Sequence, residues 1–176
     1  MMTEEELDRV DFEETPKRPN FLVFLIVLTG ISVFMLIYSS LEGLIKGPFT
    51  EEYLEHYMAE QYEALDELKN VFGSSGRVVE IAEQAIAMAV YQNNEVFYLF
   101  NIFTLIQALL GMAAIVLMFR LKKIGFHLYV GYCLFPILMT YLLFPAAMIS
   151  AYLIMGTLLI STLFCVLYGL NLKHMK

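Results

Sequence analysis

The chain has 176 residues, which is the length expected of one domain. Hydrophobic residues make up 59% of it and its mean hydropathy is +0.66, both well above the values of a soluble domain. With a formal net charge of −7 it has no basic face for the phosphate backbone of a nucleic acid. The composition therefore favours a membrane protein and disfavours nucleic acid as a partner.

The first 20 residues carry charges of both signs and end in TPKRPN. Such a segment buries little apolar surface, so we expect a flexible acidic arm over residues 1–20. A solvated tail and a docking peptide for a partner both remain open for this arm. Because acidic residues precede the first apolar run, that run differs from a cleaved signal peptide, which starts with basic residues.

Three long runs without Asp, Glu, Lys or Arg predict transmembrane helices. They are Phe21–Leu41, Val96–Phe119 and Ile124–Leu170, with 21, 24 and 47 residues. A helix needs roughly 20 residues to cross a bilayer core, so the third run holds two spans. A break at Pro145 leaves two pieces of suitable length, whereas a break at Pro136 leaves one too short and one too long. The predicted spans are residues 21–41, 96–119, 124–144 and 146–170, followed by a tail over residues 171–176.

The segment between the first two spans, residues 42–95, predicts a helical hairpin. Thr50 is a suitable N-cap for its first helix, and GSSG at residues 73–76 ends that helix. A second helix starts at about Arg77 and runs towards the next span with only a bend. Apolar residues recur at helical spacing along the first helix. The partner-binding candidates among them are Leu54, Tyr57, Met58, Leu65, Leu68 and Phe72. This stripe either packs on the second helix and the membrane surface or binds a partner protein.

Positive charge predicts the orientation of the spans, because Lys and Arg concentrate in cytoplasmic segments. Eight of the eleven cations lie in the two termini and in the connection at residues 120–123. That connection holds Arg120, Lys122 and Lys123, which we expect to fix the topology and to meet anionic lipid headgroups. The 42–95 segment instead has eleven acidic residues against three cations. Both termini are therefore expected in the cytoplasm and the hairpin outside it.

Small and weakly polar residues recur at helical spacing in spans 1, 2 and 4, and they predict close packing between helices. The helix-packing candidates are Ser39, Gly43, Asn101, Thr104, Ala108, Gly111, Ser150, Thr157, Ser161, Cys165 and Gly169. A polar cavity for a small ligand, with Gln107 beside these residues, is the alternative interpretation. Cys133 and Cys165 both fall in predicted spans, and we expect them to pack as thiols rather than form a disulfide.

The sequence offers little catalytic chemistry. No charged residue falls at the centre of a span, where it would mark a transporter or a proton relay, and His127 is expected within one turn of the cytoplasmic surface. Glu52, His56 and Glu60 share one side of a helix, but one histidine among many acidic residues is a weak metal motif. HExxH, CxxC and Gly-rich phosphate loops do not occur. We therefore predict no catalytic residue, no metal ligand and no cofactor.

Two segments of the chain have a familiar pattern, MFRLKKIGFHLYVGY at Met118–Tyr132 and LYGLNLKHMK at Leu167–Lys176, with a looser match at RPNFL before the first span. They resemble a family of small four-span membrane proteins of Bacteroidota-type bacteria. In that family a span ends in a basic turn and is followed by a helix that contains Gly and an aromatic residue. The resemblance covers mainly spans 2–4. It implies a bacterial inner membrane and no particular activity.

These patterns together predict an all-α fold, namely an integral membrane four-helix bundle with an extracytoplasmic helical hairpin between spans 1 and 2. The main functional hypothesis is a non-catalytic accessory or scaffold subunit of a larger cell-envelope membrane complex. Its partners would be the lipid bilayer and other membrane subunits or a second copy of itself. The alternative is a small transporter or lipid-handling protein that uses the polar faces of spans 2 and 4. An intramembrane enzyme is the third hypothesis, with His56, His127 and His174 as its histidine bases.

Overall fold

The computed structural model describes residues 19–176, and over this range it contains helices and no strand. The arm expected over residues 1–20 lies outside the described residues except for its last two. Within the described range four helices are long and apolar enough to cross a membrane. They are α2 (Asn20–Lys46), α5 (Phe97–Phe119), α6 (Ile124–Leu143) and α7 (Ala151–Gly169). The expectation of an all-α chain with four long apolar helices is confirmed.

The connections between these helices fall where charge and proline indicate breaks. α5 and α6 are joined by the charged turn at residues 120–123. α6 ends at Leu143, shortly before Pro145, whereas Pro136 stays inside the helix. α2 continues to Lys46, five residues beyond the apolar run, because nothing before Gly47 and Pro48 prevents further helical turns.

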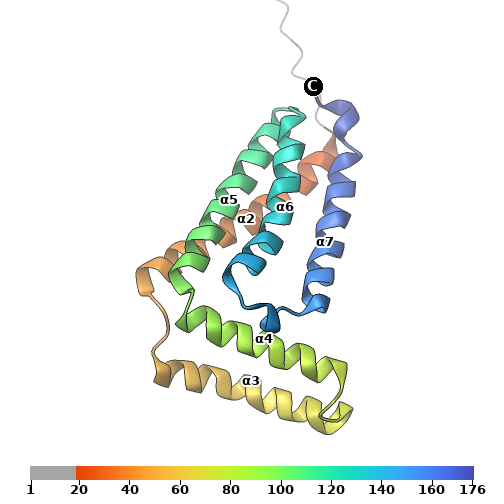
Figure 1. The fold of residues 1–176 in the computed structure, drawn as a ribbon. Coiled ribbons are helices and arrows are strands. Elements are labelled where there is room, and N and C mark those ends of the chain that lie inside the picture. Colours follow the sequence, from red (N-terminus) through yellow and green to blue (C-terminus); the bar gives the residue numbers. More distant parts are fainter. Residues whose placement is uncertain (1–18) are drawn as a thin grey trace, which may run out of the picture.

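α5 is the central helix of the bundle and packs closely on both α2 and α6 (Figure 1). Gly111 on α5 lies where these three helices meet. A Cβ atom at Gly111 would lie 2.8 Å from side-chain atoms of Val33 on α2 and of Tyr132 on α6. Since real Cβ atoms do not approach other atoms so closely, only glycine allows this three-helix contact.

α7 lies at the margin of the bundle and packs chiefly against α6. Only 6% of the residues in its most apolar stretch are buried, against 39% in α5. α2 crosses behind α5 and α6, so it approaches α7 at one end of the bundle and diverges from it towards the other (Figure 1). Near the end where the two helices approach, the hydroxyl groups of Thr29 on α2 and Tyr168 on α7 lie 2.8 Å apart.

The last residues of the chain fold back onto the charged turn, and we call this end of the bundle the tail end. A short 3-10 helix, η2 (Leu172–His174), follows α7. The backbone N–H of Lys176 then donates to the carbonyl oxygen of Leu121 at 2.7 Å, and the N–H of Lys123 donates to the carbonyl oxygen of Lys176 at 2.9 Å. The main buried cluster lies beneath this contact; its residues are Leu22, Leu25, Ala114, Ile115, Met118, Leu121, Tyr129, Cys133, Tyr168 and Met175.

Two further helices cross the opposite end of the bundle, which we call the hairpin end (Figure 1). α3 (Glu51–Phe72) and α4 (Arg77–Asn94) run antiparallel beside each other. α4 contacts α5 and the 3-10 helix η1 (Ala146–Met148), whereas α3 packs on α4. α3 therefore forms an outer layer, separated from the four apolar helices by α4.

Local chemistry explains the limits of α3. Thr50 is its N-cap, and the Thr50 hydroxyl accepts a hydrogen bond from the backbone N–H of Tyr53 at 3.4 Å. Glu51 and Glu52 in the first turn suit the positive end of the helix dipole. The helix ends at Gly73, which has a φ of +76°, a conformation that glycine adopts without strain.

Candidate functional site

A cavity of about 230 Å³ lies among the four apolar helices. Every one of these helices contributes to its wall, and the lining residues are Leu28, Thr29, Ser32, Gln107, Tyr129, Tyr132, Cys133, Pro136, Ile160, Ser161 and Phe164. None of these residues carries a charge at neutral pH. Hydroxyl, amide and thiol groups stand among apolar and aromatic side chains, and the wall is therefore uncharged and mostly apolar.

The Gln107 side chain is the most unusual group in this wall. It is 7% exposed, yet its amide makes no side-chain hydrogen bond to any residue in the described range. Among the described residues, the fully enclosed side-chain oxygens without a hydrogen-bond partner are those of Ser40 and Ser150, so the Gln107 amide atoms are not fully enclosed. Gln107 lies twelve residues from the end of α5, roughly 18 Å along the helix at about 1.5 Å per residue. The amide is thus unpaired deep inside the bundle, where it faces the cavity.

Two features of α6 add polar groups to the same wall. Pro136 has no backbone N–H, so the carbonyl of Tyr132 lacks its usual partner one turn later. The Ser161 hydroxyl on α7 donates to the carbonyl oxygen of Cys133 at 3.4 Å. Backbone oxygens of α6 therefore serve as acceptors at the level of the cavity, in addition to the side chains.

The cavity has an entrance between α2 and α7. Leu28 and Ser32 on α2 are exposed, and so is Ile160 on α7, with 63% of its surface accessible. All three line the cavity. Beyond the contact between Thr29 and Tyr168 the two helices diverge (Figure 1), and these exposed lining residues lie on the two diverging helices.

The structure brings some of the helix-packing candidates on α2 and α5 into contact. A Cβ atom at Gly43 would lie 2.7 Å from the Asn101 side-chain oxygen, so these two residues touch across α2 and α5. Asn101 and Thr104 are buried and also bond to backbone carbonyls of their own helix. Ser39 is exposed, while its neighbour Ser40 is buried. Ala108 is fully buried, and Gly111 holds the three-helix contact described above.

The candidates on α7 are less tightly packed. Ser161 reaches α6, and Cys165 lines a second groove between α6 and α7. A Cβ atom at Gly169 would lie 3.9 Å from Phe126, which is ordinary contact. Thr157 is half-buried and bonds to the carbonyl of Leu153 on its own helix. Ser150 precedes α7 and is buried.

The partner-binding candidates of the hairpin divide into two groups. Met58 and Leu65 are buried, and Leu54 and Leu68 are half-buried. Tyr57 and Phe72 remain exposed, with 53% and 55% of their surfaces accessible. Two of the six therefore remain available to a partner.

Tyr57 belongs to an aromatic cluster at the start of α3, which we call the aromatic corner. It consists of Phe49, Tyr53 and Tyr57, all exposed. The ring of Phe49 lies 4.8 Å from that of Tyr53 and 6.0 Å from that of Tyr57. Asn93 at the end of α4 holds this corner in place. Its side chain accepts from the Phe49 N–H at 2.8 Å and donates to the Phe49 carbonyl at 3.1 Å.

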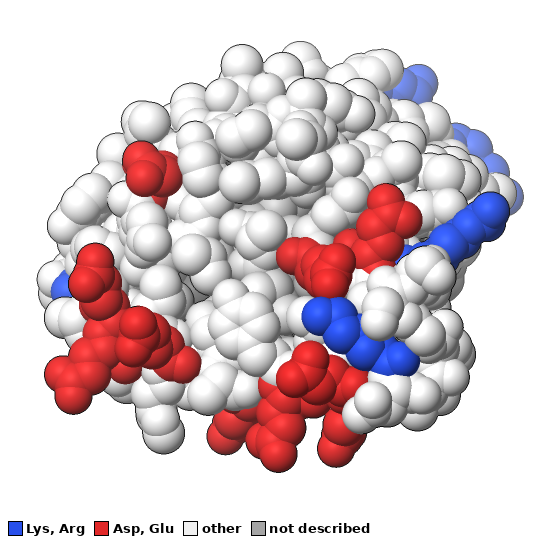
Figure 2. Space-filling model, turned by 60° about the horizontal axis from the view of Figure 1, so that its bottom comes forward, with Lys and Arg blue, Asp and Glu red and all other residues white. Residues whose placement is uncertain are grey.

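Acidic side chains dominate the hairpin surface, as the view onto the hairpin end shows (Figure 2). Lys69 partly offsets them, with its ammonium 3.1 Å from the Glu83 carboxylate and 4.0 Å from that of Asp66. Glu52, His56 and Glu60 are all exposed on α3. Within residues 19–176 no three His, Cys, Asp or Glu side chains form a group that could hold a metal ion.

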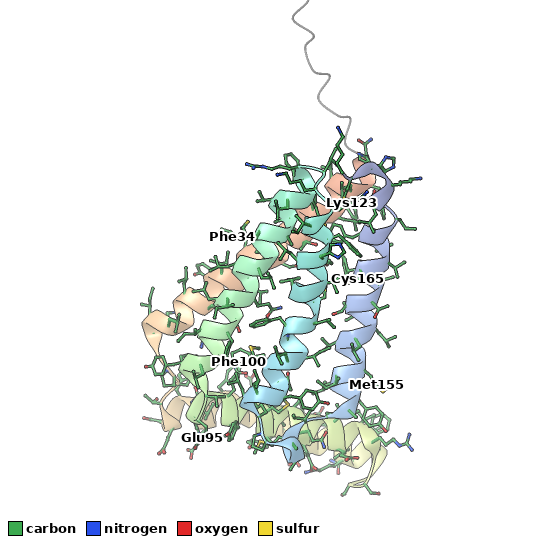
Figure 3. The ribbon with its side chains drawn as sticks, turned by 45° about the horizontal axis from the view of Figure 1, so that its top comes forward. Phe34, Glu95, Phe100, Lys123, Met155 and Cys165 are labelled. Carbon is green, nitrogen blue, oxygen red and sulfur yellow. The ribbon has the colours of Figure 1, made fainter. Side chains whose placement is uncertain are left out.

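The cations expected to fix the topology lie at the tail end. Arg120, Lys122 and Lys123 are all exposed. Lys123 and the acidic Glu95 stand at opposite ends of the bundle (Figure 3). The backbone pairing of Lys176 with this turn brings the cations of the tail to the same end of the molecule.

Sequence patterns predict only part of the cavity wall. Gln107 is an amide on a predicted span, beside residues that could line a polar cavity. Nothing in the sequence distinguishes Tyr129 and Tyr132, because aromatic residues are common in apolar helices, and no pattern points to Asn93.

Comparison with known proteins assigns no family to this arrangement. No protein-family model matches the chain, and searches of the curated proteins and of the solved structures find no match.

Proposed function

We propose that the chain is a multi-pass protein of a bacterial inner membrane, with both termini in the cytoplasm, that acts as a non-catalytic accessory or scaffold subunit of a larger membrane complex. The observation that carries this proposal is the outer layer formed by α3. A 22-residue helix packs chiefly on α4, buries only Met58 and Leu65, and leaves most of its surface accessible.

Membrane insertion is supported by the surfaces of the apolar helices. Large hydrophobic side chains are exposed along each of them, such as Phe34 on α2, Leu109 on α5 and Leu159 on α7. Contiguous apolar surface of this extent is unusual on a soluble monomer, because water would drive it to aggregate. Lipid chains cover such surfaces without cost, and helices satisfy their backbone groups internally.

The distribution of charge supports the orientation. The described cations outside the hairpin segment, Arg120, Lys122, Lys123, Lys173 and Lys176, all lie at the tail end. The hairpin end carries the eleven acidic residues of the 42–95 segment. Because positively charged segments are retained in the cytoplasm, this separation favours a cytoplasmic tail end and an extracytoplasmic hairpin.

The surface of α3 indicates the chemistry of a partner. The 42–95 segment has a net charge of −8, and the aromatic corner stands among its carboxylates. Exposed Tyr and Phe side chains held on a rigid backbone are typical of interface anchors. We infer a partner protein with a basic face, which carboxylates attract over distances of about 8–10 Å at physiological salt.

Gentle extraction followed by native gels and cross-linking tests this function. The wild-type protein should migrate in a stoichiometric assembly larger than a monomer. A Tyr57→Ser, Phe72→Ser double variant should shift to the monomer, because it removes exposed anchors without disturbing buried packing. Tyr98→Ser, which removes an exposed aromatic side chain from α5, is the matched control and should leave the assembly intact. A monomer in every mild detergent would contradict the proposal.

The cavity favours a second candidate function, a small transporter or lipid-handling protein. Its wall brings Gln107 of α5 and Ser161 of α7 to one space, which supports a role for residues on or beside the polar faces of the second and fourth apolar helices. Flux or lipid transfer in proteoliposomes tests it. The activity should be lost in Gln107→Leu, and a wild-type protein without flux or transfer would contradict it.

A further inference from the structure

The cavity at Gln107 is not needed by an accessory subunit that binds its partner through α3. We propose that it binds the head of an uncharged, membrane-soluble lipid that carries hydroxyl or carbonyl oxygens, with the lipid's apolar chain leaving the bundle between α2 and α7. This inference rests on the proposed membrane insertion and is independent of the accessory role.

The unpaired amide of Gln107 carries the inference. Its side chain is more than nine-tenths buried, lines the cavity and has no hydrogen-bond partner among the described residues. The amide offers two N–H donors and one carbonyl acceptor, so it pairs equally well with a carbonyl or a hydroxyl group. Tyr132, another lining residue, presents a hydroxyl group for which the structure shows no hydrogen bond. A bound head with one or two oxygens would satisfy both residues.

The neutral wall decides the charge of the ligand. No Asp, Glu, Lys, Arg or His contributes to the cavity, whose side chains come from the interior of four apolar helices. An ion moved from water to such a place loses its hydration and finds no opposite charge, which costs several kcal/mol or more. A phosphate, carboxylate or ammonium head is therefore rejected, and an uncharged head is accepted.

Size and access decide how the ligand is held. The cavity of about 230 Å³ is smaller than the roughly 300–1,000 Å³ of a typical ligand pocket, so only a small head fits inside. Leu28 and Ile160 stand exposed at the entrance, one on each side, and both are apolar. A chain that leaves between them passes directly into the lipid. A lipid with a small oxygen-bearing head fits this arrangement better than a water-soluble ligand.

The aromatic side chains in the cavity wall allow two kinds of uncharged lipid head to bind. The rings of Tyr129 and Tyr132 lie 5.6 Å apart in a tilted arrangement, and Phe164 lines the same space. Such a wall accepts a flat quinone ring as well as a glycerol backbone. Both heads are uncharged and carry oxygen atoms. Decylubiquinone is the probe for the quinone ring, and 1,2-dioctanoylglycerol is the probe for the glycerol backbone.

Native mass spectrometry of the full chain in phosphatidylcholine nanodiscs measures the binding of each probe. We expect saturable one-to-one binding of at least one neutral probe and no binding of decyl phosphate, which offers a charged head on a similar chain. Preference for one neutral probe would identify the head as ring or glycerol. If neither binds saturably, the cavity holds only water and the inference is wrong.

Three variants locate the binding. Gln107→Leu should weaken it roughly tenfold, the effect of one lost hydrogen bond to a buried group. Thr104→Val is the matched control, because Thr104 is buried on the same helix, bonds to the carbonyl of Phe100 and does not line the cavity. Ile160→Trp narrows the entrance from an exposed position, so it should block binding even if Gln107→Leu does not fold. Wild-type affinity in the Ile160→Trp protein, or in a folded Gln107→Leu protein, would overturn the inference.

The same preparations separate this inference from the proposed function. A protein that enters nanodiscs but binds no probe contradicts the lipid site alone. A protein that is recovered in the soluble fraction contradicts membrane insertion, and with it both proposals.

Discussion

The hydroxyl groups of Thr29 and Tyr168 lie 2.8 Å apart and connect the first apolar helix to the last. Tyr168 is fully buried, whereas most of α7 is exposed. This contact therefore holds α7 against α2, and Thr29 also lines the cavity.

Replacing Tyr168 with Phe removes this hydrogen bond and keeps the ring. We expect a loss of about 0.6 kcal/mol in the free energy of unfolding, the average for side-chain hydrogen bonds between membrane helices, and more rapid labelling of Cys165. Thermal unfolding in detergent and thiol labelling measure the two effects. Tyr152→Phe, at an exposed position on α7, should change neither. Equal labelling of Cys165 in all three proteins would show that the bond does not hold α7.

Gly125 and Gly156 offer a matched pair of glycine substitutions. A Cβ atom at Gly125 would lie 2.6 Å from the backbone nitrogen of Met118, whereas at Gly156 no atom lies within 4 Å. Gly125→Ala should destabilise the protein by about 1–3 kcal/mol, because a backbone atom cannot move aside cheaply. Gly156→Ala should be neutral or stabilising by up to about 1 kcal/mol, since alanine favours the helix.

Chemical denaturation of the two variants in the same detergent compares them directly. The opposite order of stability would mean that the turn between α5 and α6 is more open than the structure shows.

Asn93 is expected to anchor the hairpin to the bundle. Its side chain makes two hydrogen bonds to the backbone of Phe49 and is 8% exposed. Asn93→Ala leaves backbone groups of the linker unpaired, and the local cost should be about 1–3 kcal/mol. Hydrogen exchange should become faster at residues 47–54, with the four apolar helices unchanged. Asn70→Ala, at an exposed position on α3, is the control and should exchange like the wild type at residues 47–54.

Lys69 forms an ion pair at the surface of the hairpin, where we expect a smaller contribution to stability than from the buried Asn93 side chain. Its ammonium lies 3.1 Å from the Glu83 carboxylate and joins α3 to α4, but both side chains are partly exposed. Exposed pairs contribute about 0–1 kcal/mol, so Lys69→Met should have little effect on the hairpin at 150 mM salt. Exchange in α3 that is clearly faster than in the wild type would show that the ion pair matters more than its exposure indicates.

The sequence predicts the features that depend on local chemistry. Thr50 caps α3, a glycine in the left-handed conformation ends it, and three cations form the turn between α5 and α6. Proline at position 145 separates α6 from α7 because it disfavours helical angles at the residue before it. These outcomes need no knowledge of distant residues, since each follows from a few neighbours in the chain.

The features that depend on tertiary packing could not be predicted in this way. Periodicity on α5 marks a polar face but does not reveal that Gln107 meets a cavity while Asn101 meets Gly43. Asn93 and Phe49 are 44 residues apart, and no pattern relates an asparagine to a particular backbone segment. The return of Lys176 to Leu121 depends on how α7 is placed beside α6. The wall of the candidate site therefore emerged only from the structure.

The central claim is that the hairpin and the tail end lie on opposite sides of a membrane. Labelling of single introduced cysteines with a membrane-impermeant maleimide in intact bacterial cells tests it most directly, with Ser75→Cys in the hairpin turn and Lys173→Cys in the tail, both at exposed positions. The unmodified chain, whose Cys133 and Cys165 lie within the apolar helices, gives the background. The account predicts that Ser75→Cys reacts in intact cells and that Lys173→Cys reacts only after permeabilisation. Equal labelling of both positions in intact cells would contradict it.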